Sequence, residues 1–360
     1  MIKNKVLILA MLIVAIVAVG SVSAADDVAV DIDEPADDIA VDEIAIEDDS
    51  ADETDEIVET EQTRTITYTP YYIDTTSDFD GINYNITNGI FDGYEFIFDN
   101  TNDYTNFSMV TGNNNKFTGN GATIIGSTDN LFTVAGSNNI VITGFNMNVA
   151  TGKAAIYGAN VFNAEITNNN ITGGKDGINI MQTHDNITIS GNTITGVTRD
   201  AISLVDHRNL SDTEWANKGY STISNNIIIG SEYAMFFGGN FKGTIEDNII
   251  NGSDYGIEFA GKKAVTNGRL QVDIIANDIY NVQTGIDMYH PNVEYLYMGL
   301  NNIETLNNSS CSAIKINSNF AKSTGGEIWI YDNYLYGQVN QTFINVCDAF
   351  EDNYGYIIVN

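Results

Sequence analysis

The chain has 360 residues, with 48 Asp plus Glu against 15 Lys plus Arg and a formal net charge of −33. This charge argues against a nucleic-acid-binding protein, because binding phosphates requires a basic surface. Two cysteines are too few for a disulfide-stabilised scaffold or a cysteine-rich zinc module. A hydrophobic content of 43% is too high for a wholly disordered chain, so we expect a packed domain.

The N-terminus has the pattern of an export signal. Lys3 and Lys5 precede an apolar run from Val6 to Val19, and the small residues 21–25 suit signal peptidase. We interpret residues 1–25 as a signal peptide, with an uncleaved N-terminal anchor as the alternative. Both predict a secreted or cell-surface protein, in which asparagine glycosylation is possible. Nine Asn-x-Ser/Thr sequons occur, at Asn85, Asn106, Asn170, Asn186, Asn209, Asn251, Asn307, Asn308 and Asn340.

Residues 26–61 carry 18 acidic side chains and no basic one. Self-repulsion should keep this segment extended and solvated, so we predict a disordered acidic linker. A stalk that binds divalent cations or repels the cell wall is the alternative. Residues 62–112 are rich in tyrosine, and we expect them to form an N-terminal cap and the first irregular strands, because an uncovered end of a solenoid invites aggregation.

Two short motifs alternate along residues 113–360. The first, I-x-x-N-x-I, begins at Ile166, Ile189, Ile223, Ile245 and Ile274 and, with conservative changes, at Met298 and Ile330. The second is a small residue followed by apolar, any, apolar, as in Gly177-Ile178-Asn179-Ile180 and Ala201-Ile202-Ser203-Leu204. This period-2 patterning indicates strands with one buried face. Coils of about 22 to 24 residues, each stacked on the one before, predict a parallel β-helix.

One asparagine of each first motif falls in register on successive coils. These residues form a predicted ladder of Asn169, Asn192, Asn226, Asn248, Asn277, Asn301 and Asn333. Stacked amides hydrogen-bond to one another, and we expect the same asparagines to take the left-handed backbone of the turn between strands. The ladder explains why the chain is so rich in asparagine.

The asparagine ladder and the Gly-Ile-x-apolar strands resemble the repeats of the pectin-lyase-like superfold. With the predicted signal, the acidic segment and the phrase Phe117-Thr118-Gly119-Asn120-Gly121-Ala122-Thr123-Ile124-Ile125-Gly126, the resemblance extends to archaeal adhesin-like surface proteins. It implies an all-β fold, a right-handed parallel β-helix solenoid preceded by the signal peptide and the acidic segment. The superfold also carries lyases, hydrolases, epimerases and binding shafts, so the fold leaves the activity open.

Charged residues stack on successive coils just before the second motif. Lys175 and Arg199 share one column, and Asp176 and Asp200 share the next. A surface ion-pair ladder is one interpretation. Resemblance to polysaccharide lyases of the superfold implies another, in which Asp176, Asp200 and Asp206 bind calcium and Arg199 or Lys175 removes a proton next to a uronate carboxyl. Calcium is expected only under this alternative, and we predict no other cofactor or metal.

Three coils carry insertions, at residues 206–219, 260–269 and 317–326, and these should project from one edge of the solenoid. We call their basic and aromatic side chains the predicted ridge: Arg208, Trp215, Lys218, Lys262, Lys263, Arg269, Phe320 and Lys322. Such a ridge suits stacking on sugars and binding of anionic groups. Solvated loops without a ligand are the alternative.

The leading functional hypothesis is therefore an exported, adhesin-like β-helix that presents a carbohydrate- or partner-binding edge. A polysaccharide lyase or other carbohydrate-active enzyme acting on uronate-containing glycans is the first alternative, and a structural component of the cell envelope is the second. The expected partner is a carbohydrate or another cell surface. The C-terminal residues 354–360 resemble the start of a further strand and could pair with a partner through the end of the coil.

Overall fold

The computed structural model describes residues 66–260, 268–290, 292–306, 310–316, 322–336, 344–346 and 358–359. The predicted signal peptide and acidic linker lie outside these residues and stay predictions. Within the described ranges, no helix is both long and apolar enough to cross a membrane.

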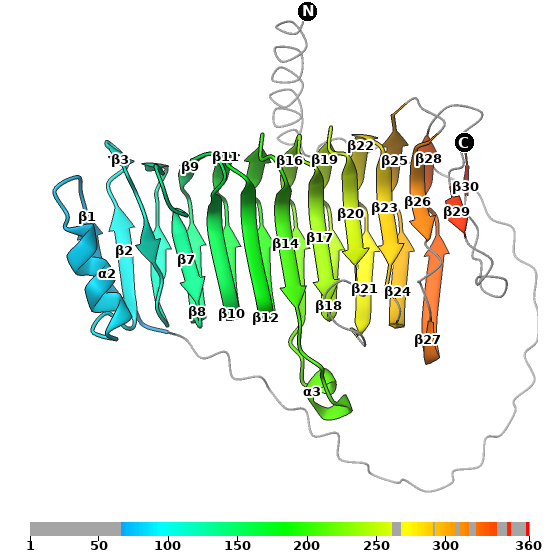
Figure 1. The fold of residues 1–360 in the computed structure, drawn as a ribbon, viewed down its shortest axis with the longest axis horizontal. Helices are drawn as coiled ribbons and strands as arrows, with labels where there is room; N and C mark the ends of the chain where they lie inside the picture. Colours follow the sequence, from blue (N-terminus) through cyan, green and yellow to red (C-terminus); the bar gives the residue numbers. More distant parts are fainter. Residues whose placement is uncertain are drawn as a thin grey trace, which may run out of the picture. The chain divides into compact units, whose positions relative to one another are not determined.

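The strands stack in parallel into three ladders that run along the solenoid (Figure 1). The first ladder contains β4 (Met109–Val110), β7 (Phe132–Ala135), β10 (Ala154–Thr167), β12 (Asp176–Ser190), β14 (Asp200–Asp206), β17 (Tyr233–Gly239), β20 (Tyr255–Ala260), β23 (Thr284–Tyr289), β26 (Ser312–Ile316) and β29 (Ile344–Val346). The second contains β1 (Thr69–Ile73), β2 (Tyr94–Phe98), β5 (Lys116–Thr118), β8 (Asn138–Thr143), the C-terminal halves of β10 and β12, β15 (Ser221–Ser224), β18 (Phe241–Glu246), β21 (Leu270–Ile275), β24 (Val293–Gly299) and β27 (Lys322–Tyr331).

The third ladder contains β3 (Asp103–Thr105), β6 (Thr123–Ile125), β9 (Asn146–Val149), β11 (Asn170–Gly173), β13 (Thr193–Thr195), β16 (Ile227–Ile229), β19 (Ile249–Asn251), β22 (Asp278–Val282), β25 (Asn302–Thr305), β28 (Tyr334–Tyr336) and β30 (Ile358–Val359). β30 pairs with β28, so the predicted C-terminal strand adds to this ladder. The predicted parallel β-helix is confirmed.

The two sequence motifs correspond to different faces of each coil. The second motif lies in the first ladder, where Ile178 pairs with Ile202 and Ile202 with Met235, all fully buried. The first motif turns a corner, so that Ile223 lies in β15 of the second ladder and Ile228 in β16 of the third. Three strands per coil therefore enclose one core of inward-facing Ile, Phe and Met side chains.

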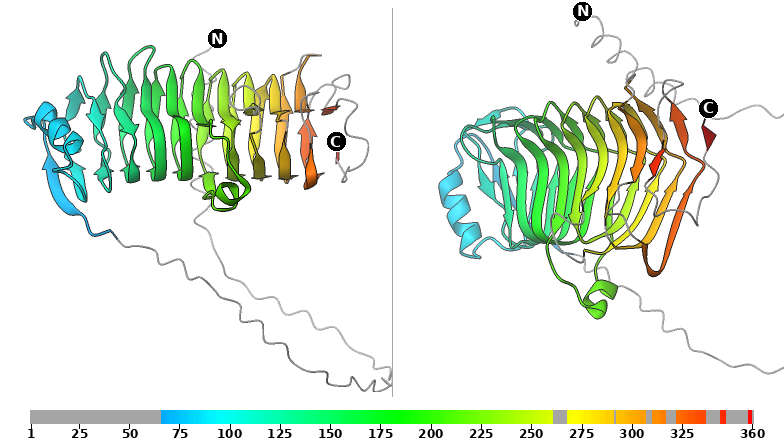
Figure 2. Two further views of the ribbon diagram at one scale, coloured as in Figure 1. Left: turned by 60° about the horizontal axis from the view of Figure 1, so that its bottom comes forward. Right: turned by 45° about the vertical axis from the view of Figure 1, so that its right-hand side comes forward.

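Aromatic side chains fill the core at the N-terminal end. Phe96 and Phe117 stack with ring centroids 5.0 Å apart, and Phe145 occupies the ladder position that holds asparagine in later coils. The helix α2 (Phe79–Thr87) lies at this end beside β1, and it buries Ile82 and Ile86 (Figure 2). An apolar helix face thus covers core that an uncovered coil would leave in water.

The asparagine ladder runs through the corner between the second and third ladders. The Oδ1 of Asn226 accepts bonds of 3.0 Å from both the backbone N–H and the side-chain amide of Asn192. Asn226 in turn donates its backbone N–H and its Nδ2 to Oδ1 of Asn248, and Nδ2 also donates to the carbonyl of Ile189. Because the same pattern repeats from Asn169 to Asn333, these buried amides are satisfied.

The prediction that the ladder asparagines themselves take the left-handed backbone was wrong. That conformation belongs to the residue before each of them: Asn168, Gly191, Asn225, Asp247, Ala276, Leu300 and Asp332, with φ between 53 and 66°. The preceding residue makes the turn, and the ladder asparagine can then direct its N–H and its amide to the next coil. The turn position accepts several residue types, whereas the ladder position holds asparagine in every coil from Asn169 to Asn333.

Replacing Asn226 with leucine should lower the free energy of unfolding by about 3–5 kcal/mol, because the buried backbone N–H of Asn192 loses its acceptor and Oδ1 of Asn248 loses one of its two donors. Urea denaturation of the full chain, followed by circular dichroism, measures the effect. Asn225→Gly is the matched control, since Asn225 is exposed and glycine readily takes its φ of 55°. Equal midpoints for the two variants would contradict a structural role for the ladder.

Candidate functional site

A groove of about 230 Å³ lies on the outer side of the first ladder, across β12, β14 and β17. Its floor and walls are side chains that alternate with the buried core residues of these strands. The lining residues are Asn179, Met181, Arg199, Asp200, Ser203, Val205, Tyr233 and Phe236. The groove therefore combines acidic, amide and aromatic groups on one face of the solenoid.

Arg199 joins the carboxylates of two neighbouring coils at one end of the groove. Its Nε lies 2.9 Å from Oδ1 of Asp176 and 3.0 Å from Oδ2 of Asp200, and its Nη2 lies 2.9 Å from Oδ2 of Asp176. Both carboxylates are nearly buried, whereas about a third of the Arg199 side chain is exposed. These charges therefore stack on successive coils, as the sequence predicts.

Burial raises the pKa of Asp200 to about 6. The positive charge of Arg199 opposes this shift, and the negative charges of Asp176 and Glu232 add to it. Asp200 therefore gains or loses its charge at a mildly acidic pH, although a solvated aspartate would be ionised there.

Asn179 holds a polar atom that the protein does not satisfy. Its side chain is 2% exposed, and its Nδ2 donates to Oδ2 of Asp176 over 3.1 Å. Its Oδ1 has no hydrogen-bond partner among the residues that the structure describes. An unpaired buried acceptor costs about 1–3 kcal/mol, so a donor that enters the groove would be stabilised there.

Two aromatic rings, Tyr233 and Phe236, border the groove, and a third ring stacks on Tyr233. Tyr233 meets Phe236 edge to face, with centroids 5.8 Å apart and an interplanar angle of 73°. Tyr233 also stacks on Tyr255 of the next coil at 4.8 Å and 13°. Each of the three side chains is only partly buried, so part of its ring surface is open to a ligand.

The structure does not bring the predicted calcium ligands together. Asp206 lies at the other end of β14 from Asp200 and is fully buried, and no cluster of three metal-ligating side chains occurs in the described part of the chain. Lys175 lies in the turn before β12, one coil from Arg199, and the backbone N–H of Arg199 donates to its carbonyl. The Nε and Nη2 groups of Arg199 already donate to the carboxylates of Asp176 and Asp200.

The residues of the predicted ridge do not form an exposed surface where the structure describes them. Trp215 lies in the short helix α3 (Asp212–Ala216), which begins with a capping box, and its ring is 4% exposed. Its Nε1 donates to Oε2 of Glu294 over 2.7 Å, and the cations of Lys242 and Arg269 lie 5.9 and 5.2 Å from the ring. Trp215 therefore attaches the insertion to the solenoid and does not present its face to a ligand.

The basic residues of the same insertion are paired within the chain. Asp185, Asp206, Arg208 and Lys218 form what we call the ion cluster. Lys218 Nζ lies 2.9 Å from both carboxylates, and Arg208 lies 3.0 Å from Asp185 and 2.6 Å from Asp206. The cluster closes the base of the insertion.

Of the remaining ridge residues, one is paired, three lie outside the described residues and one lies in a strand. Arg269 pairs with Glu294 and with Asp212. Lys262, Lys263 and Phe320 lie outside the described residues, and Lys322 lies in strand β27 and not in a loop.

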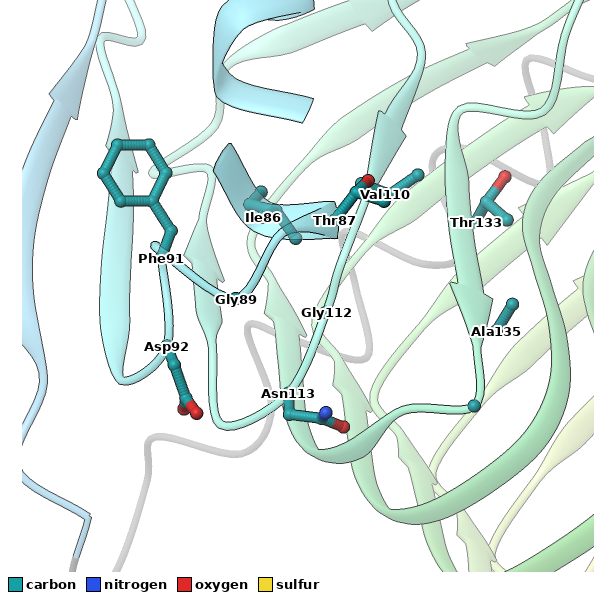
Figure 3. A pocket seen from close by; sticks show the side chains of 11 residues that line it. Ile86, Thr87, Gly89, Phe91, Asp92, Val110, Gly112, Asn113, Thr133 and Ala135 are labelled. Atoms are coloured by element: carbon teal, nitrogen blue, oxygen red, sulfur yellow. The ribbon is translucent and has the colours of Figure 1, made fainter. Parts of the chain in front are cut away.

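A second cavity, of about 350 Å³, lies at the N-terminal end between the end of α2, the following loop and the first ladder (Figure 3). Ile86, Phe91 and Val110 contribute apolar surface. Asp92 accepts a bond from Asn114, and Asn113 accepts one from the backbone of Asn138. Since these polar groups have protein partners, we regard the smaller groove on the first ladder as the better candidate site.

The sequence interpretation missed two groove residues, Asn179 and Phe236. Both occupy the variable position of the second motif, as does Ser203, and the register places the three side by side on the outer face. Reading that position down successive coils would have found them.

Replacing Lys218 with methionine should lower the free energy of unfolding by about 3–5 kcal/mol at neutral pH, because it removes a partner of buried Asp206. Burial alone would raise the pKa of Asp206, but the hydrogen bond from Arg208 and the charge of Lys218 hold it below its usual range. This stabilisation is present above the unfolded pKa of about 4 and is lost as the pH falls through the lower folded pKa.

The difference between wild type and Lys218→Met should therefore shrink below about pH 4, as urea titrations at several pH values can measure. Lys116→Met removes a partly exposed pair with Glu95 and should cost less than about 1 kcal/mol. Equal losses for the two variants would refute the role of the ion cluster.

Comparison with known proteins gives one family and one solved structure to report. The family described as "Right handed beta helix region" matches residues 96–279. No curated protein matches the chain. A tailspike protein mutant of E. coli bacteriophage HK620, solved in complex with a pentasaccharide, is 12% identical with a TM-score of 0.26, and the match covers 70% of this chain and 52% of that one. The chain thus spans about half the length of the tailspike chain.

The family match covers more than half of the chain and falls on the coils whose strands form the three parallel ladders. The chain therefore belongs to the family of proteins with a right-handed β-helix region.

Proposed function

We propose that the protein is an exported β-helix protein, secreted or held at the cell surface, that binds carbohydrate in the groove of the first ladder. The observation that carries the proposal is the buried, unpartnered Oδ1 of Asn179 in a groove bordered by aromatic rings. A sugar offers hydroxyl donors for such an acceptor, and the apolar face of its ring packs on aromatic side chains.

The proposal moves the binding surface from the predicted ridge to the face of the solenoid. Three charged residues of the predicted ridge already pair with carboxylates: Arg208, Lys218 and Arg269. Trp215 is buried against the chain itself. In the groove, by contrast, the rings of Tyr233 and Phe236 keep exposed surface.

Export and an adhesin-like role rest on the sequence. The apolar N-terminal run, the acidic linker and the resemblance to archaeal adhesin-like surface proteins support them, and glycosylation of the sequons is part of the same proposal. A structural role in the cell envelope is the alternative for a chain that binds no glycan.

The lyase alternative has one supporting observation, because Arg199, Asp176 and Asp200 do meet at the groove. It also requires Arg199 to act on the substrate, although its Nε and Nη2 already donate to the two flanking carboxylates. Because the carboxylates already engage Arg199, we propose binding and not lysis. Release of unsaturated product from pectate or alginate in the presence of calcium, lost in Arg199→Ala, would establish the lyase activity.

Phe236→Ala and Tyr233→Ala should each weaken glycan binding about tenfold, because each removes a ring that packs on the sugar. A glycan array with the full chain identifies ligands, and calorimetry on the best ligand measures the loss. Tyr72→Ala is the matched control, since Tyr72 is 75% exposed and lies in β1, away from the groove. Unchanged affinity in both groove variants would refute the site, and no binding to any glycan would favour the structural alternative.

A further inference from the structure

The polar groups that the groove can offer to a ligand are mostly acceptors. The Asn179 Oδ1 has no partner among the described residues. The carboxylate of Asp200 and the hydroxyl of Ser203 line the same groove. The Nε and Nη2 groups of Arg199, which would otherwise bind an anionic sugar, already donate to Asp176 and Asp200.

The charges around the groove also favour a cation. Asp176 and Asp200 contribute two negative charges against the single positive charge of Arg199. Lys175 and Glu232, the other charged groups whose fields reach Asp200, offset each other. The net negative charge of this group disfavours a uronate and attracts a ligand of opposite sign.

The aromatic border suits a cation as well. The faces of tyrosine and phenylalanine rings carry partial negative charge and attract ammonium groups within about 6 Å of the ring centroid. Tyr233 and Phe236 stand edge to face and present two ring surfaces in different directions. Burial raises the pKa of Tyr233 to about 12, and the negative charges of Glu258 and Glu232 add to this shift. The surroundings of the ring therefore include negative charge.

From this arrangement of acceptors, carboxylates and rings we infer that the groove selects glycans whose sugars carry a protonated amine. The ammonium group bonds to Asp200 and to Oδ1 of Asn179, while the sugar ring packs on Phe236 and Tyr233. This inference rests on the proposed function and names its ligand class: amino-sugar glycans, in place of the anionic groups that the predicted ridge suggested.

The pH dependence of binding follows from Asp200. As the pH rises through about 6, Asp200 gains its negative charge. The other charged groups near Asp200 are Arg199 on its own element, Asp176 and Lys175 on the preceding coil, and Glu232 on the following coil. A ligand whose amine is protonated at both pH values should therefore bind more tightly at pH 7 than at pH 5, whereas an uncharged sugar should bind equally at both.

The test compares three tetrasaccharides on the full chain by calorimetry at pH 5 and pH 7: one of glucosamine, its fully N-acetylated counterpart, and one of galacturonate. At pH 7 the glucosamine form should bind about tenfold more tightly than the N-acetylated form, which corresponds to one additional charged contact. At pH 5 this preference should shrink to about two- to threefold. Galacturonate should bind weakest at pH 7.

Asp200→Asn should abolish the preference for glucosamine and its pH dependence, so that the glucosamine and N-acetylated forms bind the variant about equally. Asparagine has the shape of protonated aspartate and can still accept from Arg199, so the variant should fold. Asp273→Asn is the matched control: burial also raises the pKa of Asp273, which lies on the second ladder, and its replacement should leave the preference intact.

The outcomes separate this inference from the proposed function. Equal binding of the two glucosamine forms at pH 7, or tighter binding of galacturonate, overturns the inference and leaves carbohydrate binding in place. An amine preference that persists in Asp200→Asn overturns it too, because the charge would then lie elsewhere. Failure of all three sugars and of a wider glycan array overturns both.

Discussion

The register of the coils is the constraint on which the rest of the structure depends, and the asparagine ladder helps to fix it. From Asn192 to Asn301, each ladder amide accepts two N–H groups from the coil before it and donates to both neighbouring coils. A shift of one coil by one residue would leave these buried groups unpaired and turn apolar side chains outward. The ladder thus keeps the side chains of the same motif position aligned from coil to coil.

Alignment of the coils places side chains from successive repeats next to one another on the surface. Because strands in register lie about 4.8 Å apart, residues separated by a whole coil in sequence become neighbours on one face. Arg199 reaches Asp176 of the previous coil in this way, and Tyr233 stacks on Tyr255 of the next. The groove includes the variable positions of one motif on adjacent strands, and Arg199, in the bend before β14, lines it too.

Much of the fold could be predicted from the sequence because the motifs that produce it recur once in each coil. The ladder asparagines, the parallel stacking and the neighbouring columns of Asp176 and Arg199 all follow from motif spacing. The place of the left-handed residue could not be predicted in this way. It depends on how each ladder amide is oriented at the corner, and several residue types, even Leu300 and Ala276, occupy that position.

The candidate site was harder to predict because insertions do not follow the repeat. Composition suggested that Trp215 and its basic neighbours were exposed, but Trp215 bonds to Glu294, 79 residues later, a contact that no local pattern indicates. The resemblance to polysaccharide lyases grouped Asp206 with Asp200, yet along an extended strand six residues separate side chains by about 20 Å. Asn179 and Phe236 were present in the motif but were treated as spacers.

A structure of the protein in complex with an oligosaccharide tests the central claim most directly, namely that the first ladder provides the binding surface. Our account predicts a sugar ring packed on Phe236 and Tyr233, with donors directed to Oδ1 of Asn179 and to Asp200. A sugar bound instead at the insertion around Trp215, or in the cavity beside α2, would contradict it.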